Sequence, residues 1–209
     1  MSEQAPPDLA IYVEDLDGGG VQAMRLRIAR ELIARGRSVE LLVGRAHGAL
    51  LDQVPERARV TPIPAASRLA SAARLIRSPA VPGMSALAAL RARDPDHALR
   101  HVPALVAYLD RRQPRPLLAA QPYRNLEALQ ARELARHRPR VVVSEHNDLH
   151  DGHPLGQGRS LRRLVALQRR LYPGADAVVA VSQGVAADVA RRSGLAPERI
   201  AIVYNPAVP

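Results

Sequence analysis

Three consecutive glycines, Gly18–Gly20, directly precede a helical pattern that begins near Val21. Glycine has no Cβ, so an anion can closely approach the backbone amides at such a helix N-terminus. Gly18, Gly20 and Ala23 also match the loose G-x-G-x-x-A pattern of dinucleotide-binding folds. In those folds the first glycine directly follows the strand, whereas here about four residues separate it from the apolar run that ends at Val13. The glycines predict a phosphate-binding loop or, alternatively, a connecting loop without a ligand.

A second candidate site follows the apolar run Val141–Ser144, where Glu145, His146 and Asn147 come next in the sequence. Ligands of open parallel sheets bind at the carboxyl ends of the strands, which is where these residues would lie. A histidine at this place could hydrogen-bond a sugar hydroxyl or a phosphate oxygen, and it titrates near neutrality. The alternative interpretation of His146 is a side chain that braces its loop.

The same region holds a group of residue types that can ligate metals: His146, His150, His153, Asp148 and Asp151. A helix would be needed to align His146 with His150, but Gly152 and Pro154 favour a loop. We therefore expect no metal site. Ser182 lacks the leading glycine of a nucleophile elbow, so we expect it first to cap the following helix and second to contact a ligand.

The 209-residue chain is 47% hydrophobic and carries 30 basic against 20 acidic side chains, all of the basic ones arginine. The absence of cysteine excludes disulfide scaffolds, thiolate zinc sites and cysteine nucleophiles. Arginines alternate with acidic residues over Arg25–Arg35, which is typical of a solvated helix face, and stacking aromatics are nearly missing. We expect no nucleic-acid partner. Without a signal peptide or an 18-residue apolar run, the expected location is cytoplasmic, either soluble or peripheral on the inner face of a membrane.

These residues need a scaffold, and short apolar runs alternate with amphipathic stretches along the whole chain. The runs predict strands at Leu9–Val13, Val39–Val43, Val60–Ile63, Leu117–Ala120, Val141–Ser144, Ala177–Val181 and Ile200–Tyr204. Helices are predicted at Val21–Arg35, His97–Arg112, Leu126–Arg136 with Asn125 as its cap, and Gly184–Arg192. The fold class is α/β: a doubly wound, mostly parallel Rossmann-like sheet of about six to seven strands with helices on both faces.

Four segments, taken in order, resemble glycosyltransferase family 4 enzymes: Asp17–Val43, Val142–Asn147, Tyr172–Val185 and Pro197–Pro206. The resemblance implies a GT-B enzyme, in which two Rossmann-like domains face each other across a cleft and no bound metal or other cofactor is needed. It implies that residues 1–204 form the N-terminal, acceptor-side domain and that residues 205–209 begin the interdomain linker. The Glu-x7-Glu pair of the donor-binding half does not occur, so we expect that half to be missing and the chain alone to be inactive.

The resemblance also assigns roles to residues. Gly18, Gly19 and Gly20 would approach the donor diphosphate, and His146 would be the catalytic residue that contacts the transferred sugar or its phosphate. Four polar residues would bind the acceptor: Glu145, Asn147, Asn125 and Ser182. The implied activity is that of a retaining, hexosyltransferase-type enzyme, which uses a nucleotide-sugar donor and acts on a glycan or lipid-linked acceptor of cell envelope polysaccharide biosynthesis. The missing C-terminal domain, in cis or in trans, is then a partner.

Two other functions stay open. An NADP-binding oxidoreductase domain could use Arg45, after the second strand, for the 2′-phosphate. A non-catalytic basic module could use the sheet only as a scaffold. A peripheral membrane contact is also conceivable through the arginine-rich stretch 67–112, in which Leu69, Ala73, Leu75 and Ile76 would lie inward. The alternative for that stretch is a core-facing helix with a solvated arginine side.

Overall fold

The computed structural model describes residues 5–45, 47–91, 99–149 and 158–206. Seven parallel strands form one open sheet in the order β3-β2-β1-β4-β5-β6-β7. The strands are β1 (Leu9–Val13), β2 (Val39–Val43), β3 (Arg59–Pro62), β4 (Pro116–Ala120), β5 (Arg140–Glu145), β6 (Ala177–Ala180) and β7 (Ile200–Ile202). The predicted fold class is therefore confirmed, because continuous apolar runs form the buried parallel strands.

Seven helices connect these strands in the described part of the chain. They are α1 (Gly20–Ala34), α2 (Arg68–Leu75), α3 (Pro82–Arg91), α4 (Val102–Arg112), α5 (Pro122–Leu134), α6 (Gly158–Leu171) and α7 (Gln183–Ser193). The helix predicted from residue 97 begins at Val102, and residues 92–98 lie outside the described part. No helix in the described residues is both long and apolar enough to cross a membrane.

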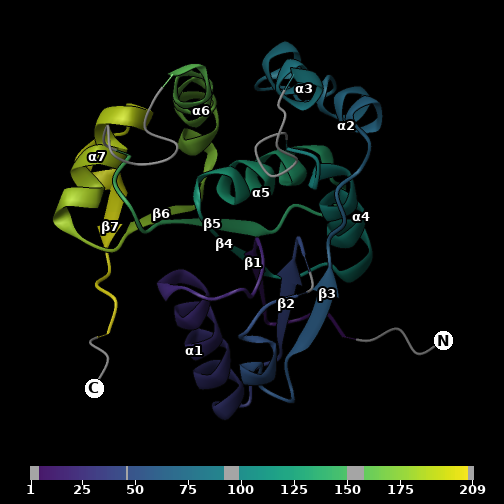
Figure 1. Ribbon diagram of the computed structural model, residues 1–209, viewed down its shortest axis with the longest axis vertical. Helices are drawn as coiled ribbons and strands as arrows, with labels where there is room; N and C mark the ends of the chain where they lie inside the picture. The colour runs from purple at the N-terminus through teal and green to yellow at the C-terminus, as the bar shows by residue number, and fades with distance from the viewer. Residues whose placement is uncertain (1–4, 46, 92–98, 150–157, 207–209) are drawn as a thin grey trace.

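The helices are divided unequally between the two faces of the sheet. Figure 1 shows α1 on one side and the other helices on the opposite side. The larger core cluster joins these other helices to alternate strand residues such as Tyr12, Val141 and Val143. The smaller cluster joins Leu26 and Ala29 of α1 to β1, to β2 and to Leu16 after β1, and Val60 of β3 packs against it. On the α1 side, Leu118, Val142 and Val179 of β4–β6 are consequently only half-buried.

The stretch 67–91 departs from the expectation for its apolar residues. Leu75 is buried as expected, but Leu69 is 75% exposed, Ile76 is 60% exposed, and Ala73 is exposed as well. The reason is that α2 is short and packs mainly on α3 and α4, which cover only its Ser71–Ala72–Leu75 side. Leu87 and Leu90 of α3 are also exposed. An apolar surface therefore lies outside the core here.

Candidate functional site

His146 lies directly beyond the carboxyl end of β5, on the face of the sheet that α1 partly covers. Side chains alternate along a strand, so Val141, Val143 and Glu145 point into the helix-covered core. Ser144 and His146 point the opposite way, and the Ser144 hydroxyl lies 2.9 Å from Nε2 of His146. The alternation thus separates His146 from its neighbour Glu145 and places it beside α1.

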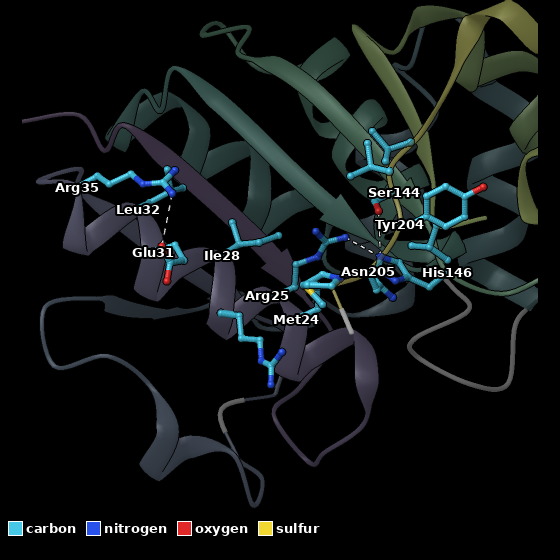
Figure 2. Close-up of a pocket in the computed structure, with 15 residues that line it drawn as sticks. Met24, Arg25, Ile28, Glu31, Leu32, Arg35, Ser144, His146, Tyr204 and Asn205 are labelled. Carbon is cyan, nitrogen blue, oxygen red and sulfur yellow. Dashed lines mark hydrogen bonds and ion pairs between the residues drawn. The ribbon is translucent and has the colours of Figure 1, made fainter. Parts of the chain in front are cut away.

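Arg25 of α1 is the second partner of His146, with its Nη2 atom 2.8 Å from Nε2 (Figure 2). A guanidinium can only donate, so Nε2 accepts and the neutral ring carries its hydrogen on Nδ1. Burial, together with the charge of Arg25, lowers the pKa of His146 to about 4. The imidazole is therefore uncharged near neutral pH, and its buried Nδ1 has no hydrogen-bond partner among the described residues.

The position of Arg25 is one that the sequence analysis did not anticipate. The arginines of this helix were interpreted as a solvated face, yet Arg25 is only 4% exposed. The buried face of α1 consists of Gln22, Arg25, Leu26 and Ala29, at helical spacings of three and four. That spacing was readable from the sequence, but Arg27, Arg30 and Arg35 around it made the whole run look solvated.

A pocket of about 380 Å³ opens beside these side chains, between α1, the ends of β5 and β6, and the segment after β7. Its lining residues are Met24, Arg25, Arg27, Ile28, Glu31, Leu32, Arg35, Ser144, His146, Val179, Val181, Val203, Tyr204, Asn205 and Pro206. Figure 2 shows Arg25 reaching from α1 toward His146, with Tyr204 and Asn205 close by. The pocket thus combines apolar side chains with charged ones, and Arg25 and His146 meet at its inner edge.

The glycine loop forms the N-terminus of α1. Gly18 and Gly19 have φ values of +127° and +119°, a backbone conformation that favours glycine, and Gly20 begins the helix. No side chain caps the helix at Gly19. A Cβ on Gly18 or Gly20 would meet nothing within 4 Å, so the backbone there borders open space. Arg25 follows Gly20 by five residues, or about 7.5 Å along the helix axis.

The loop before the glycines is held in place by its own polar contacts. The buried Asp15 accepts hydrogen bonds from the Asp17 amide and the Gln22 side chain, both at 3.2 Å. Arg45 lies 2.9 Å from both Glu14 and Asp15. Because Arg45 is committed to these carboxylates, the structure does not favour the expectation that it holds a 2′-phosphate.

Asn125 and Glu145, two of the residues assigned to acceptor binding, lie inside the molecule. Asn125 is 0% and Glu145 is 1% exposed. The Asn125 side chain donates to the Ser144 carbonyl at 3.1 Å and to Glu145 at 3.2 Å. Asn125 also does not cap its helix, because α5 already begins at Pro122 with Gln121 before it. Neither side chain presents a surface to an acceptor.

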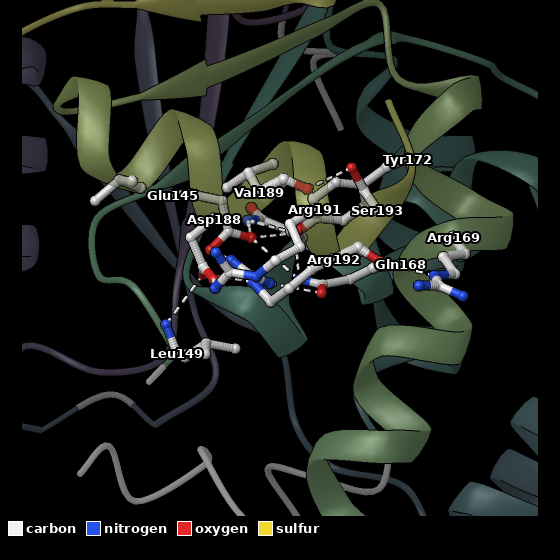
Figure 3. A network of polar contacts seen from close by, with 12 residues as sticks. Glu145, Leu149, Gln168, Arg169, Tyr172, Asp188, Val189, Arg191, Arg192 and Ser193 are labelled. Atoms are coloured by element: carbon white, nitrogen blue, oxygen red, sulfur yellow. Dashed lines mark hydrogen bonds and ion pairs between the residues drawn. The ribbon is translucent and has the colours of Figure 1, made fainter. Parts of the chain in front are cut away.

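Glu145 belongs to a buried polar network formed with α6 and α7 (Figure 3). Tyr172 donates to the Glu145 carboxylate, and Arg192 lies 3.5 Å from it. Arg192 also donates to Asp188 and to Gln168, each at 2.6 Å. Burial raises the pKa of Glu145 despite these partners. The network joins the end of β5 to the two following helices.

The remaining predicted site residues lie at the surface or outside the described chain. Ser182 caps α7 as expected, accepting a hydrogen bond from the Val185 amide at 3.2 Å. Asn147 is exposed next to His146. Three members of the expected histidine–aspartate group, His150, Asp151 and His153, lie outside the described residues. Among the residues that are described, no cluster of three or more His, Asp or Glu side chains could hold a metal ion.

Several solved structures with a similar fold are glycosyltransferases. The lipopolysaccharide outer core galactosyltransferase WaaB is 16% identical over 95% of this chain and 46% of its own, with a TM-score of 0.61. Anabaena HepE, solved with UDP and glucose, is 19% identical over 95% of this chain and 44% of its own, with a TM-score of 0.61. Sucrose-phosphate synthase from Thermosynechococcus elongatus is 12% identical over 96% and 48%, with a TM-score of 0.62.

The chain therefore spans about half the length of these structures, and its fold is that of a GT-B N-terminal domain. A search of curated proteins finds no match. The model of Glycosyltransferase Family 4 matches residues 18–208, from the glycine loop to the segment after β7. The chain belongs to glycosyltransferase family 4.

Proposed function

We propose that this chain is the acceptor-side half of a retaining, hexosyltransferase-type enzyme that moves a sugar from a nucleotide-sugar donor to a glycan or lipid-linked acceptor. One observation carries the proposal: Arg25 contacts His146 at the edge of a pocket. Arg25 belongs to α1, the helix whose N-terminus is formed by the glycine loop. HepE was solved with UDP-glucose, which supports a nucleotide-sugar donor. WaaB is a lipopolysaccharide outer core galactosyltransferase, and WaaG is a glycosyltransferase involved in lipopolysaccharide biosynthesis, which supports an acceptor of the cell envelope.

The glycine loop is the proposed contact for the donor diphosphate. Its amides border open space at an uncapped helix N-terminus, where the helix dipole favours negative charge. Phosphate oxygens could therefore be bound by backbone N–H groups without a metal or another cofactor. The nucleotide itself would be held by a second, C-terminal domain, supplied in cis or in trans.

His146 is the proposed catalytic residue that contacts the transferred sugar or its phosphate. Its Nε2 is occupied by Arg25 and its pKa is about 4, so it would not act as a general base at neutral pH. The Nδ1–H group remains available as a hydrogen-bond donor. In this proposal His146 orients the sugar and stabilises negative charge on it, and it does not remove a proton.

Asn147 and Ser182 are the acceptor-binding residues that we retain. Asn147 is exposed beside His146. The Ser182 oxygen accepts from the Val185 amide, which leaves its own hydroxyl hydrogen free to donate to a ligand. Both residues follow strands at the carboxyl edge of the sheet, where this fold class binds its ligands.

Sugar transfer tests the proposal. Two samples are incubated with labelled nucleotide sugars and membrane-derived acceptors. The first contains the chain alone, and the second contains the chain together with a donor-binding domain that carries the Glu-x7-Glu pair. We expect transfer only with both halves, retention of the anomeric configuration by NMR, and a loss of about 100-fold or more in His146→Ala. Transfer by the 209-residue chain alone would contradict the assignment as half of an enzyme.

A peripheral contact with the inner face of the membrane is the second part of the proposal. The exposed Leu69, Ile76, Leu87 and Leu90 are accompanied by exposed arginines, and no acidic residue occurs between 64 and 91. Apolar side chains beside cationic ones are typical of surfaces that bind anionic lipid. This surface would bring the enzyme to a lipid-linked acceptor.

Vesicle flotation tests this contact. We expect the chain to float with anionic phosphatidylglycerol vesicles but not with neutral phosphatidylcholine, and we expect Leu69→Gln/Ile76→Gln to reduce flotation several-fold. Leu51→Gln is the matched control, because Leu51 is 38% exposed but lies elsewhere, in the turn before β3. Equal flotation with both lipids would contradict a cytoplasmic peripheral location of this kind.

A further inference from the structure

Arg25 differs from the other deeply buried arginines of the described chain in having no carboxylate partner. Arg124, which is 1% exposed, lies 2.9 Å from Glu127. Arg192, which is 6% exposed, lies 2.6 Å from Asp188 and 3.5 Å from Glu145. Arg25 is 4% exposed, and its recorded partner is the neutral His146. A buried guanidinium without a counter-charge is unfavourable unless something else supplies the negative charge.

Within the described part of the chain, the surroundings of Arg25 do not supply that charge. Burial, with no opposing carboxylate, lowers the pKa of Arg25 to about 10. Glu31 is the acidic residue in the pocket lining, and it lies 3.6 Å from the exposed Arg35 at the protein surface. Arg27 and Arg35 line the same pocket and add further positive charge. The pocket is therefore cationic and complementary to an anion.

Unused hydrogen-bond donors are also present at this point. A guanidinium has five N–H groups, and His146 accepts from one nitrogen of Arg25. The buried Nε of Arg25 and the buried Nδ1 of His146 both lack partners among the described residues. Two unpartnered donor atoms on neighbouring side chains would normally be satisfied by a ligand or by water.

We infer that Arg25 and His146 form a subsite for an oxyanion, a phosphoryl or carboxylate group carried by the substrate. The guanidinium provides the charge and two or more N–H donors, and His146 adds one further donor at Nδ1. This inference rests on the proposed function, because it assumes that the pocket beside Arg25 and His146 binds the substrate. It adds that the group bound there is anionic, as in a sugar phosphate or a sugar acid.

The test is an NMR titration of the purified 209-residue chain with inorganic phosphate, glucuronate and UDP, observing the His146 ring and the Arg25 side chain. We expect saturable shifts of both with phosphate or with glucuronate, and whichever of the two binds more tightly identifies the oxyanion. Arg25→Met should weaken that binding about tenfold or more, the typical value of a charged hydrogen bond. Arg30→Met is the matched control, because Arg30 is exposed on the same helix and does not line the pocket, and it should bind within about twofold of the wild type.

Equal binding by Arg25→Met and the wild type, or the absence of saturable shifts with every anion, would overturn the inference. Binding of UDP with no response to phosphate or glucuronate would also overturn it, because the ligand would then be recognised as a nucleotide. A folded Arg25→Met spectrum shows that lost binding is not lost structure. If no anion binds while His146→Ala still abolishes sugar transfer, the subsite fails and the proposed function stands.

Discussion

Two neighbouring residues, Glu145 and His146, belong to opposite sides of the sheet and to two kinds of polar site. Glu145 is enclosed by Tyr172, Asn125 and Arg192, so its charge is matched inside the protein. His146 borders a pocket, and its partner Arg25 has no carboxylate of its own among the residues that the structure describes. Residue type alone therefore does not identify a ligand site, since both places hold buried ionisable groups. A buried charge left unmatched points to the side on which a ligand binds.

The largest expected difference between the two sides is the cost of losing their arginines. Arg192→Met leaves the buried Glu145 without a cation and leaves Asp188 with Arg191 alone, so we expect a loss of about 3–5 kcal/mol in the free energy of unfolding. Arg25→Met removes a charge that has no counter-charge, and we expect unchanged or increased stability. Urea denaturation of both variants measures this. Similar losses of unfolding free energy in the two variants would show that the charges of Arg25 and Arg192 are matched to the same degree inside the protein.

A smaller difference is expected for two tyrosines. Tyr172 is buried and donates to Glu145, so Tyr172→Phe should cost about 1–3 kcal/mol by leaving the carboxylate short of a donor. Tyr204 lines the pocket and is 63% exposed, and Tyr204→Phe should change stability by less than about 0.5 kcal/mol. The same denaturation curves report both values. A costly Tyr204→Phe would show that the pocket side is also a structural network.

The subtlest expected difference is in the pH dependence of stability. The pKa of His146 is lowered from 6.5 to about 4 by burial and by Arg25, so the unfolded chain binds the proton more readily. The stability from this group is fully present above pH 6.5 and is lost as the pH falls toward 4. His146→Gln should flatten the curve in this window, and Arg25→Met should raise the pKa of His146 by removing a neighbouring charge. NMR titration of the ring measures that pKa, and an unchanged value in Arg25→Met would contradict the contact.

The sequence predicts the scaffold well because buried parallel strands are continuous apolar runs. The bounds of Leu9–Val13 and Val39–Val43 are confirmed to the residue, and Ser182 caps its helix as its residue type suggests. The capping role of Asn125 was wrong, and its acceptor-binding role stays a prediction that its burial does not favour. The helix begins at Pro122, four residues before the predicted start at Leu126, so Asn125 lies within the helix and its side chain donates to the Ser144 carbonyl of β5.

The candidate site was predictable only in part. His146 follows from its place after a strand, but its partner Arg25 does not, because a charge is buried by tertiary packing that a local pattern does not contain. The same limit applies to Glu145. Strand alternation predicts that Glu145 and His146 point to opposite faces of the sheet. Which of these faces is enclosed depends on the placement of α6 and α7, which the local sequence does not contain.

The most direct test is the stabilisation of the folded chain by an oxyanion. Denaturation curves are recorded for the wild type and Arg25→Met in phosphate and in sodium chloride of equal ionic strength. We predict that phosphate at tenfold its dissociation constant stabilises the wild type by about 1.4 kcal/mol, and that it stabilises an Arg25→Met variant that binds tenfold more weakly by only about 0.4 kcal/mol. Equal stabilisation of the two proteins would contradict the account, because the unmatched charge of Arg25 would then not mark the ligand side of the sheet.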